Sequence, residues 1–323
     1  MTEPQSPLHL LSVGSFPVPI SDSESESEAH FKYGFTTSKS LLSQYPHIDH
    51  VPLSKGDTAL GVHKNSSRTS HRLVKPPKAS SSPPRTSDKT RDPEEAWEAF
   101  YPKGSINPSA SIAGGFSFYL SGPKEFKERL ESGNGAKEVL FGYRMMLEDG
   151  WEWVKGGKLP GFFGGVGERA YGCTGGRQDH RCQCFDIRPM WRANGVAELY
   201  TYLPLTSSNA THLLAVPPIS RANADYGYSV GRGAFRLDTA VGNWVSIAFR
   251  VTMNDVGVEN GEIQLWFDGV EVISVKGLTF RESAEARIKG MHFQTFFGGH
   301  TEDWASPKDQ KSWFSDIVGI IVK

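Results

Sequence analysis

Apolar and polar residues alternate with a period of two along several short segments after residue 110. The clearest case is 244–253, where every second residue is apolar: Val245, Ile247, Phe249, Val251 and Met253. This pattern is typical of a strand with one buried face. Similar runs over 114–120, 137–146, 291–297 and 313–322 are separated by Gly, Asn and Asp, which favour turns. The segments therefore predict many short strands.

Turn and helix signals complete the predicted elements. Asp268-Gly269 separates the strand-like runs 262–267 and 270–275, which predicts a β-hairpin. A helical pattern is limited to 124–130 and to 93–100, which has Pro93 at its start. Many strands with few helices predict an all-β chain, a β-jelly-roll sandwich of the concanavalin A-like type, over residues 96–323.

Residues 1–95 differ in composition from the rest of the chain. All eight tryptophans lie at or beyond Trp97. The N-terminal part contains an alternating Ser and acidic run at 21–28 and a basic, Ser- and Pro-rich stretch at 63–91. Such segments bury too little apolar surface to offset their chain entropy, so we predict a disordered tail that is dispensable for the fold. The alternative is that the stretch around Phe31, Tyr33 and Phe35 forms a strand over the sandwich.

Charge and hydropathy exclude several classes of protein. The chain has 35 Lys and Arg against 36 Asp and Glu, a net charge of -1, whereas nucleic-acid binders carry a basic excess. No apolar run approaches the length of a membrane span. No Lys or Arg precedes Lys32, so the N-terminus does not read as a secretory signal. We expect no nucleic acid and no membrane as partners, and a monomer.

The three cysteines lie within residues 173–184. Cys173, His180, Cys182 and Cys184 supply four possible zinc ligands, but their spacing lacks the two separated pairs of a zinc site. In an oxidising compartment the odd count predicts one disulfide and one free thiol. We expect no metal and no essential cofactor. The sequence does not exclude a structural Ca²⁺, because the oxygen ligands of this ion are scattered along a chain and form no compact motif.

A second hairpin, over 184–203, carries most of the candidate chemistry. Asn194-Gly195 marks its turn. A three-residue loop at 193–195, with Gly195 left-handed, pairs Arg188 with Tyr200 and Asp186 with Tyr202, whereas a two-residue loop would mix apolar and polar residues on each face. One face then holds Phe185, Ile187, Trp191, Leu199 and Leu203, and the other holds Asp186, Arg188, Arg192, Glu198, Tyr200 and Tyr202.

The charges around this hairpin indicate an anionic ligand. Between Lys155 and Arg192 there are seven basic residues and three acidic ones. This local excess on a neutral chain favours a polyanionic substrate, and an arginine beside two tyrosines suits a carbohydrate cleft. The alternative is a solvated outer face with amphipathic tyrosines.

Several segments in order resemble polysaccharide lyase family 14, in particular its fungal branch. They are 155–165, Cys173-Thr174-Gly175-Gly176, 185–192, Tyr200-Thr201-Tyr202, 261–269 and Gln294-Thr295-Phe296-Phe297-Gly298-Gly299. The resemblance extends from about Phe116 to the end of the chain. It implies a β-jelly-roll and eliminative cleavage of a 1,4-linked uronic-acid polysaccharide such as alginate or glucuronan.

The resemblance also implies roles for individual residues. The conserved lysine of the family falls on Lys158, its arginine on Arg188 and its paired tyrosines on Tyr200 and Tyr202. We expect Arg188 to hold the C5 carboxylate and Tyr200 to act as base or acid. Lys158 would polarise the carboxylate or share in proton transfer, and Tyr202 would orient the sugar. The family's cysteine pattern implies a Cys173–Cys184 disulfide.

The chain departs from the family at Asp186, where a serine is usual. A carboxylate there repels an anionic sugar unless it pairs with Arg188 or is protonated. The alternative function is therefore a catalytically inactive jelly-roll that binds acidic glycans. We also expect Arg192, His292 and Gln294, with Asp186, to contact the substrate. The resemblance implies an extracellular protein, while the N-terminus lacks a signal, so the compartment stays undecided.

Overall fold

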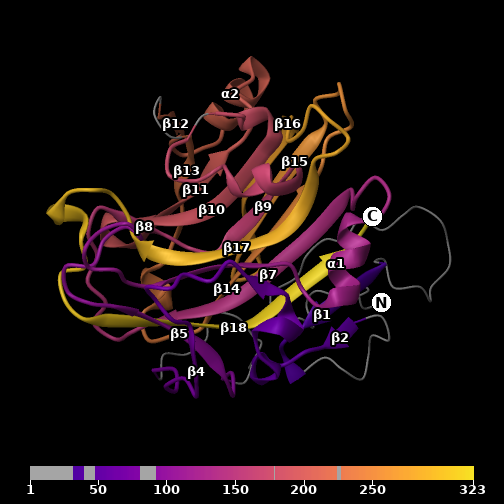
Figure 1. Cartoon of the computed structure of the whole chain (residues 1–323). Helices are drawn as coiled ribbons and strands as arrows, with labels where there is room; N and C mark the ends of the chain where they lie inside the picture. The colour runs from indigo at the N-terminus through magenta and orange to yellow at the C-terminus, as the bar shows by residue number, and fades with distance from the viewer. Residues whose placement is uncertain (1–31, 40–47, 81–91, 178, 224–226) are drawn as a thin grey trace, which may run out of the picture.

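The computed structural model describes residues 32–39, 48–80, 92–177, 179–223 and 227–323, which form two nine-stranded sheets packed face to face (Figure 1). Sheet A has the order β16 (Val270–Leu278), β15 (Gly261–Phe267), β14 (Val245–Thr252), β7 (Glu138–Leu147), β18 (Gln310–Ile321), β1 (Tyr33–Thr36) and β2 (Ile48–His50). Two further strands, β5 (Ala96–Tyr101) and β4 (Arg72–Val74), extend from β18.

Sheet B carries the hairpin singled out in the sequence. Its order is β12 (Arg221–Ala222), β13 (Tyr228–Arg236), β11 (Val196–Tyr202), β10 (Cys184–Arg192), β8 (Gly156–Lys158), β17 (Arg287–Phe297), β6 (Phe116–Leu120) and β3 (Val62–His63). The strand β9 (Gly161–Gly165) continues β8 between β10 and β17. The helices α1 (Lys124–Glu131) and α2 (Ser207–Leu214) lie at the periphery of the sheets (Figure 1).

The core between the sheets is rich in aromatic side chains. Phe118 of β6 and Phe293 of β17 stack at 5.3 Å, and Phe314 of β18 contacts Phe293 from the opposite sheet. Trp97 packs edge-on against Phe118. The alternating pattern of the sequence therefore buries one face of each sheet, and the prediction of an all-β sandwich is confirmed.

Most predicted elements are present, and one is wrong. The strands expected around 114–120, 137–146, 244–253, 291–297 and 313–322, the 262–275 hairpin and the 124–130 helix all form. The segment 93–100, predicted as a helix, is the strand β5, which pairs antiparallel with β18 and buries Trp97. Its place beside a long strand of sheet A overrides the local helical preference.

The predicted domain boundary at residue 95 requires correction. Four strands, β1 to β4, lie within residues 33–74. The strands β1, β2 and β4 belong to sheet A, and β3 belongs to sheet B. The strand β1 pairs antiparallel with β18, and the fully buried Phe35 contacts Phe126 of α1. Backbone pairing with β18 and burial of Tyr33 and Phe35 together hold β1 in sheet A, although the strand has few apolar residues. The acidic run at 21–28 and part of the basic stretch, at 81–91, lie outside the described residues.

No helix in the described part of the chain is long and apolar enough to cross a membrane.

Candidate active site

The β10–β11 hairpin has the register expected from its sequence. Arg188 lies opposite Tyr200, and Asp186 lies opposite Tyr202. The loop 193–195 closes the hairpin, with both Asn194 and Gly195 at positive φ (60° and 72°). The apolar face belongs to the core between the sheets: Phe185, Ile187, Trp191, Leu199 and Leu203. The polar face of the hairpin therefore lies on the outer side of sheet B.

Lys158 reaches this outer face through an irregularity in its strand. It lies opposite Met190 of β10, whereas Phe162 of β9 lies opposite Ile187. The two registers differ by one residue, so a bulge separates β8 from β9 at Leu159-Pro160. Leu159 and Phe162 consequently both face the core, although they are three residues apart. The bulge leaves Lys158 on the same side as the polar face of the hairpin.

The amine of Lys158 lies over the two tyrosines. Its Nζ is 3.9 Å from the ring centre of Tyr200 and 5.2 Å from that of Tyr202. The lysine is 9% exposed. Burial and the positive charge of Arg188 lower the pKa of Lys158 well below its usual value, while Asp186 acts in the opposite direction. The amine is therefore easier to deprotonate than an ordinary lysine.

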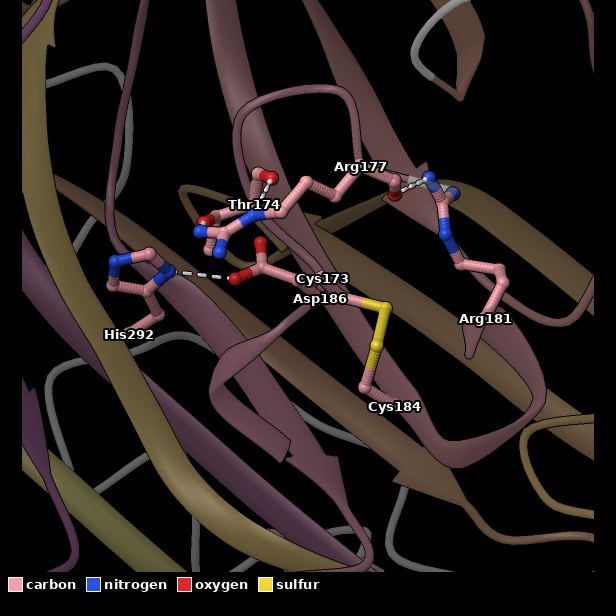
Figure 2. The surroundings of a disulfide bond; sticks show 7 residues. All are labelled: Cys173, Thr174, Arg177, Arg181, Cys184, Asp186 and His292. Carbon is pink, nitrogen blue, oxygen red and sulfur yellow. Dashed lines mark hydrogen bonds and ion pairs between the residues drawn. A yellow bond between two sulfur atoms is a disulfide. The ribbon is translucent and has the colours of Figure 1, made fainter. Parts of the chain in front are cut away.

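Asp186 connects two other predicted site residues. One carboxylate oxygen forms an ion pair with Arg188, 2.6 Å from its Nε. The other lies 2.6 Å from Nδ1 of His292 (Figure 2). Although burial alone raises the pKa of Asp186, the charge of Arg188 and the hydrogen bond from His292 lower it on balance. Burial and Arg188 lower the pKa of His292 to about 4. Neutral His292 thus donates its Nδ1 proton to an ionised carboxylate.

A second contact fixes the other end of Arg188. Its Nη1 donates to Oε1 of Gln294 at 2.5 Å, and the amide of Gln294 donates to Ser117 Oγ at 2.9 Å. On the same strand pair, Tyr119 stacks on His292 with ring centres 4.3 Å apart. Ser117 and Tyr119 were not identified from the sequence. The alternation of 116–120 predicts a strand with Ser117 and Tyr119 on one face. Only the pairing of β6 with β17 shows that this face lies beside His292 and Gln294.

A disulfide-closed loop covers one side of the site. Cys173 and Cys184, the pair implied by the family resemblance, form a disulfide, and Cys182 is free. Within the loop, Arg177 hydrogen bonds to Thr174, and Arg181 donates to the carbonyl of Arg177 (Figure 2). The loop therefore has internal contacts of its own beside the strand that carries Asp186.

The same loop encloses Tyr202. The guanidinium carbon of Arg181 lies 4.7 Å from the ring centre of Tyr202, and the backbone N–H of Gly176 donates to its hydroxyl. Burial raises the pKa of Tyr202, although Arg188 acts to lower it. Tyr202 is consequently held as a neutral phenol under the loop.

Arg192 is the one predicted site residue that lies apart from this cluster. It pairs with the buried Glu198 of β11. Met190 lies between Arg188 and Arg192 on β10. Lys158, Asp186, Arg188, Tyr200, Tyr202, His292 and Gln294 are therefore brought together, and Arg192 belongs to a neighbouring group.

The described residues contain no group of three His, Cys, Asp or Glu side chains that could hold a metal ion. Two of the four zinc ligands considered from the sequence, Cys173 and Cys184, are joined in the disulfide. Among these residues the site consists of amine, guanidinium, imidazole, phenol and carboxylate groups, which suit proton transfer and the binding of an anion.

Comparison with known proteins identifies the family. The family model described as polysaccharide lyase 14 matches residues 89–317. The chain belongs to this family. A similar solved structure is the PL-14 alginate lyase of Aplysia kurodai, with 29% identity, a TM-score of 0.62 and coverage of 84% of this chain and 96% of that one. The match to the family model begins at residue 89, before Phe116, where the resemblance seen in the sequence begins.

A more distant structure has the same fold. The alginate lyase vAL-1 from Chlorella virus is 21% identical with a TM-score of 0.56, covering 83% of this chain and 96% of its own. The comparison with curated proteins finds no match.

Proposed function

We propose that this protein cleaves a 1,4-linked uronic-acid polysaccharide, such as alginate or glucuronan, by β-elimination. The observation that carries the proposal is the desolvated amine of Lys158, which lies over the rings of Tyr200 and Tyr202 and feels the charge of Arg188. The alginate lyases that this chain resembles support the same class of substrate.

The reaction requires a proton acceptor and a proton donor on one face. The base removes the C5 proton, the electron pair forms the C4=C5 double bond, and the C4–O bond breaks as the leaving oxygen is protonated. The lowered pKa of Lys158 suits the base. The phenol of Tyr200, whose ring lies against the Lys158 amine, suits the acid. Tyr202 orients the sugar beside them.

Arg188 is placed to meet the C5 carboxylate. Its Nε pairs with Asp186 and its Nη1 with Gln294, which leaves Nη2 outside both contacts. Stabilisation of the carboxylate makes the C5 proton more acidic, and a guanidinium is well suited to hold it. Because Asp186 already offsets the charge of Arg188, we expect substrate binding to be weaker than with an unpaired arginine.

The direct test is the ultraviolet absorbance of the new double bond on incubation with alginate, glucuronan and other polyuronates. We expect Tyr200→Phe and Lys158→Met to lower the rate at least 100-fold, the usual contribution of a general acid or base. Tyr33→Phe is the matched control, because Tyr33 lies on β1 of sheet A, where its hydroxyl donates to Asp49. No absorbance change on any polyuronate would overturn the proposal.

The alternative, an inactive module that binds acidic glycans, is supported by the Asp186–Arg188 ion pair. This function predicts binding of polyuronates without product, with an affinity that Tyr200→Phe leaves unchanged. Measurement of binding and of turnover on the same preparations separates the two functions.

A further inference from the structure

A second group of charges lies on the outer face of sheet B, around the buried carboxylate of Glu198. Oε1 of Glu198 accepts from Nε of Arg192 at 2.9 Å, and Oε2 accepts from Nε of Arg232 at 2.5 Å. Ser229 also donates to Oε2, at 2.6 Å. The side chain of Glu198 is 0% exposed, whereas those of Arg192 and Arg232 are 16% and 32% exposed. The anion is thus buried beneath two partly accessible cations.

This group carries a net positive charge. Burial raises the pKa of Glu198, but the hydrogen bonds and charge of Arg192, with Ser229 and Arg232, lower it on balance, so the carboxylate is ionised. Two guanidinium groups then share one carboxylate. The Arg188–Asp186 pair, in contrast, is balanced one to one. The group of Arg192, Arg232 and Glu198 therefore carries one positive charge in excess.

The group adjoins the proposed catalytic residues. Glu198 precedes Tyr200 by two residues on β11 and lies opposite Met190, which also lies opposite Lys158. Arg192 is four residues from Arg188 along β10, about 13 Å at the rise of an extended strand. Arg192 and Arg188 therefore occupy different positions along the face.

We propose that Arg192 and Arg232, fixed by Glu198, bind the carboxylate of a uronate unit beside the one that is cleaved. The inference rests on the proposed function, because it assigns a further subsite for the same polyanion. Each guanidinium uses Nε and Nη2 within the group, to Glu198 or Ser229. Neither Nη1 has a hydrogen bond among the described residues, and these donors suit a carboxylate.

The shared carboxylate distinguishes this group from an ordinary surface ion pair. Arg236, on the same strand as Arg232, pairs one to one with Asp238, and both side chains are about half exposed. Such exposed pairs contribute little and leave no excess charge. Glu198, in contrast, holds two side chains rigidly, which lowers the entropy cost of binding a ligand.

The test uses Arg232→Gln, Arg232→Lys and, as matched control, Arg236→Gln in the full chain. On polyuronate we expect Arg232→Gln to raise KM about tenfold, the loss of one charge-assisted hydrogen bond, while kcat changes less than twofold. Arg232→Lys keeps the charge and should show a smaller rise. Arg236→Gln should match the unsubstituted protein. Thermal unfolding checks that each variant is folded.

Equilibrium binding gives a readout that is independent of turnover. Each substitution is repeated in the Tyr200→Phe background, and binding of alginate and glucuronan oligosaccharides is followed by tryptophan fluorescence. We expect the same tenfold loss for Arg232→Gln. An unchanged KM and affinity would overturn the inference while cleavage by the parent protein still supports the proposed function. If the parent neither binds nor cleaves any polyuronate, the proposed function fails, and the subsite with it.

Discussion

A carboxylate oxygen of Asp186 lies 2.6 Å from Nε of Arg188, and both side chains are 2% exposed. The guanidinium that would hold the substrate carboxylate is therefore already paired with a carboxylate of the protein. Any anionic sugar must share Arg188 with Asp186, so this contact sets the electrostatic balance at the centre of the site.

We predict two opposite effects of Asp186→Ser. Loss of the carboxylate leaves Arg188 buried without its counter-charge, which should lower the free energy of unfolding by about 3 kcal/mol in urea titrations. The unpaired guanidinium should in turn bind a polyuronate more tightly, so the substrate should raise the melting temperature of Asp186→Ser more than that of the parent.

Asp255→Ser is a suitable control, because Asp255 forms its ion pair with Lys137 at the surface. We expect it to change stability much less than Asp186→Ser. Equal substrate-induced shifts in the parent and in Asp186→Ser would contradict the view that Asp186 competes with the substrate.

The pKa of His292 predicts a dependence of stability on acidic pH. It is lowered from 6.5 to about 4 in the folded protein. Between these values the unfolded chain binds more protons, so the free energy of unfolding should rise with pH from 4 to 6.5, by about 3 kcal/mol from this group. Urea unfolding at several pH values measures the slope.

His292→Gln isolates this contribution, since other acid-sensitive groups are common to both proteins. We expect a flatter profile between pH 4 and 6.5 in the variant. Parallel profiles would show that His292 titrates near its ordinary pKa, and the description of a neutral imidazole beside Asp186 would then be wrong.

The disulfide predicts a difference between the cysteines. Cys173→Ser opens a loop whose ends are 11 residues apart, which should cost about 2–3 kcal/mol of unfolding free energy. It should also lower turnover, because Gly176 and Arg181 of this loop contact Tyr202. Cys182→Ser removes the free thiol and should leave both quantities close to the parent values. A similar loss in both variants would count against the pairing.

The strand β1 predicts which N-terminal truncation is tolerated. A chain that starts at residue 94 lacks β1 and exposes the surface that Phe35 covers, so we expect it to be insoluble or to melt far below the full chain. Phe35→Ala should lower the unfolding free energy by about 3–5 kcal/mol. Leu73→Ala, at a half-exposed position of β4, is the control and should have a small effect. A stable chain starting at residue 94 would refute this prediction.

The sequence predicted the parts of the fold that local pattern determines. The alternation of 244–253 and the Asp268-Gly269 turn identified β14 to β16, because burial of one face leaves a period of two. Tyr33–Thr36 is too short and too isolated to show such a period. Its strand exists because β18 offers an open edge, which is a tertiary effect. Pairing with another part of β18 likewise explains why the segment 93–100, predicted as a helix, contains the strand β5.

The candidate site likewise has contacts that local sequence pattern predicts and contacts that only the tertiary structure determines. The register of 184–203 could be worked out from the polar and apolar faces, which placed Arg188 opposite Tyr200. The contact of Asp186 with His292 joins residues 106 positions apart and depends on the order of strands in sheet B. The contact of Arg232 with Glu198 could not be predicted from the sequence either, because the register of β13 against β11 shifts between Val230 and Phe235.

The bulge at Leu159-Pro160 has a consequence for the evolution of this glycine-rich segment. A stretch with so many glycines would ordinarily accept insertions and deletions. Here the loss or gain of one residue between Lys158 and Phe162 reverses which side of sheet B carries the amine, and it drives either a charge into the core or an apolar side chain out of it. Length is therefore a property that descent must preserve in this segment, together with glycines such as Gly157 and Gly161, where a Cβ would collide with Trp191 and Ile187.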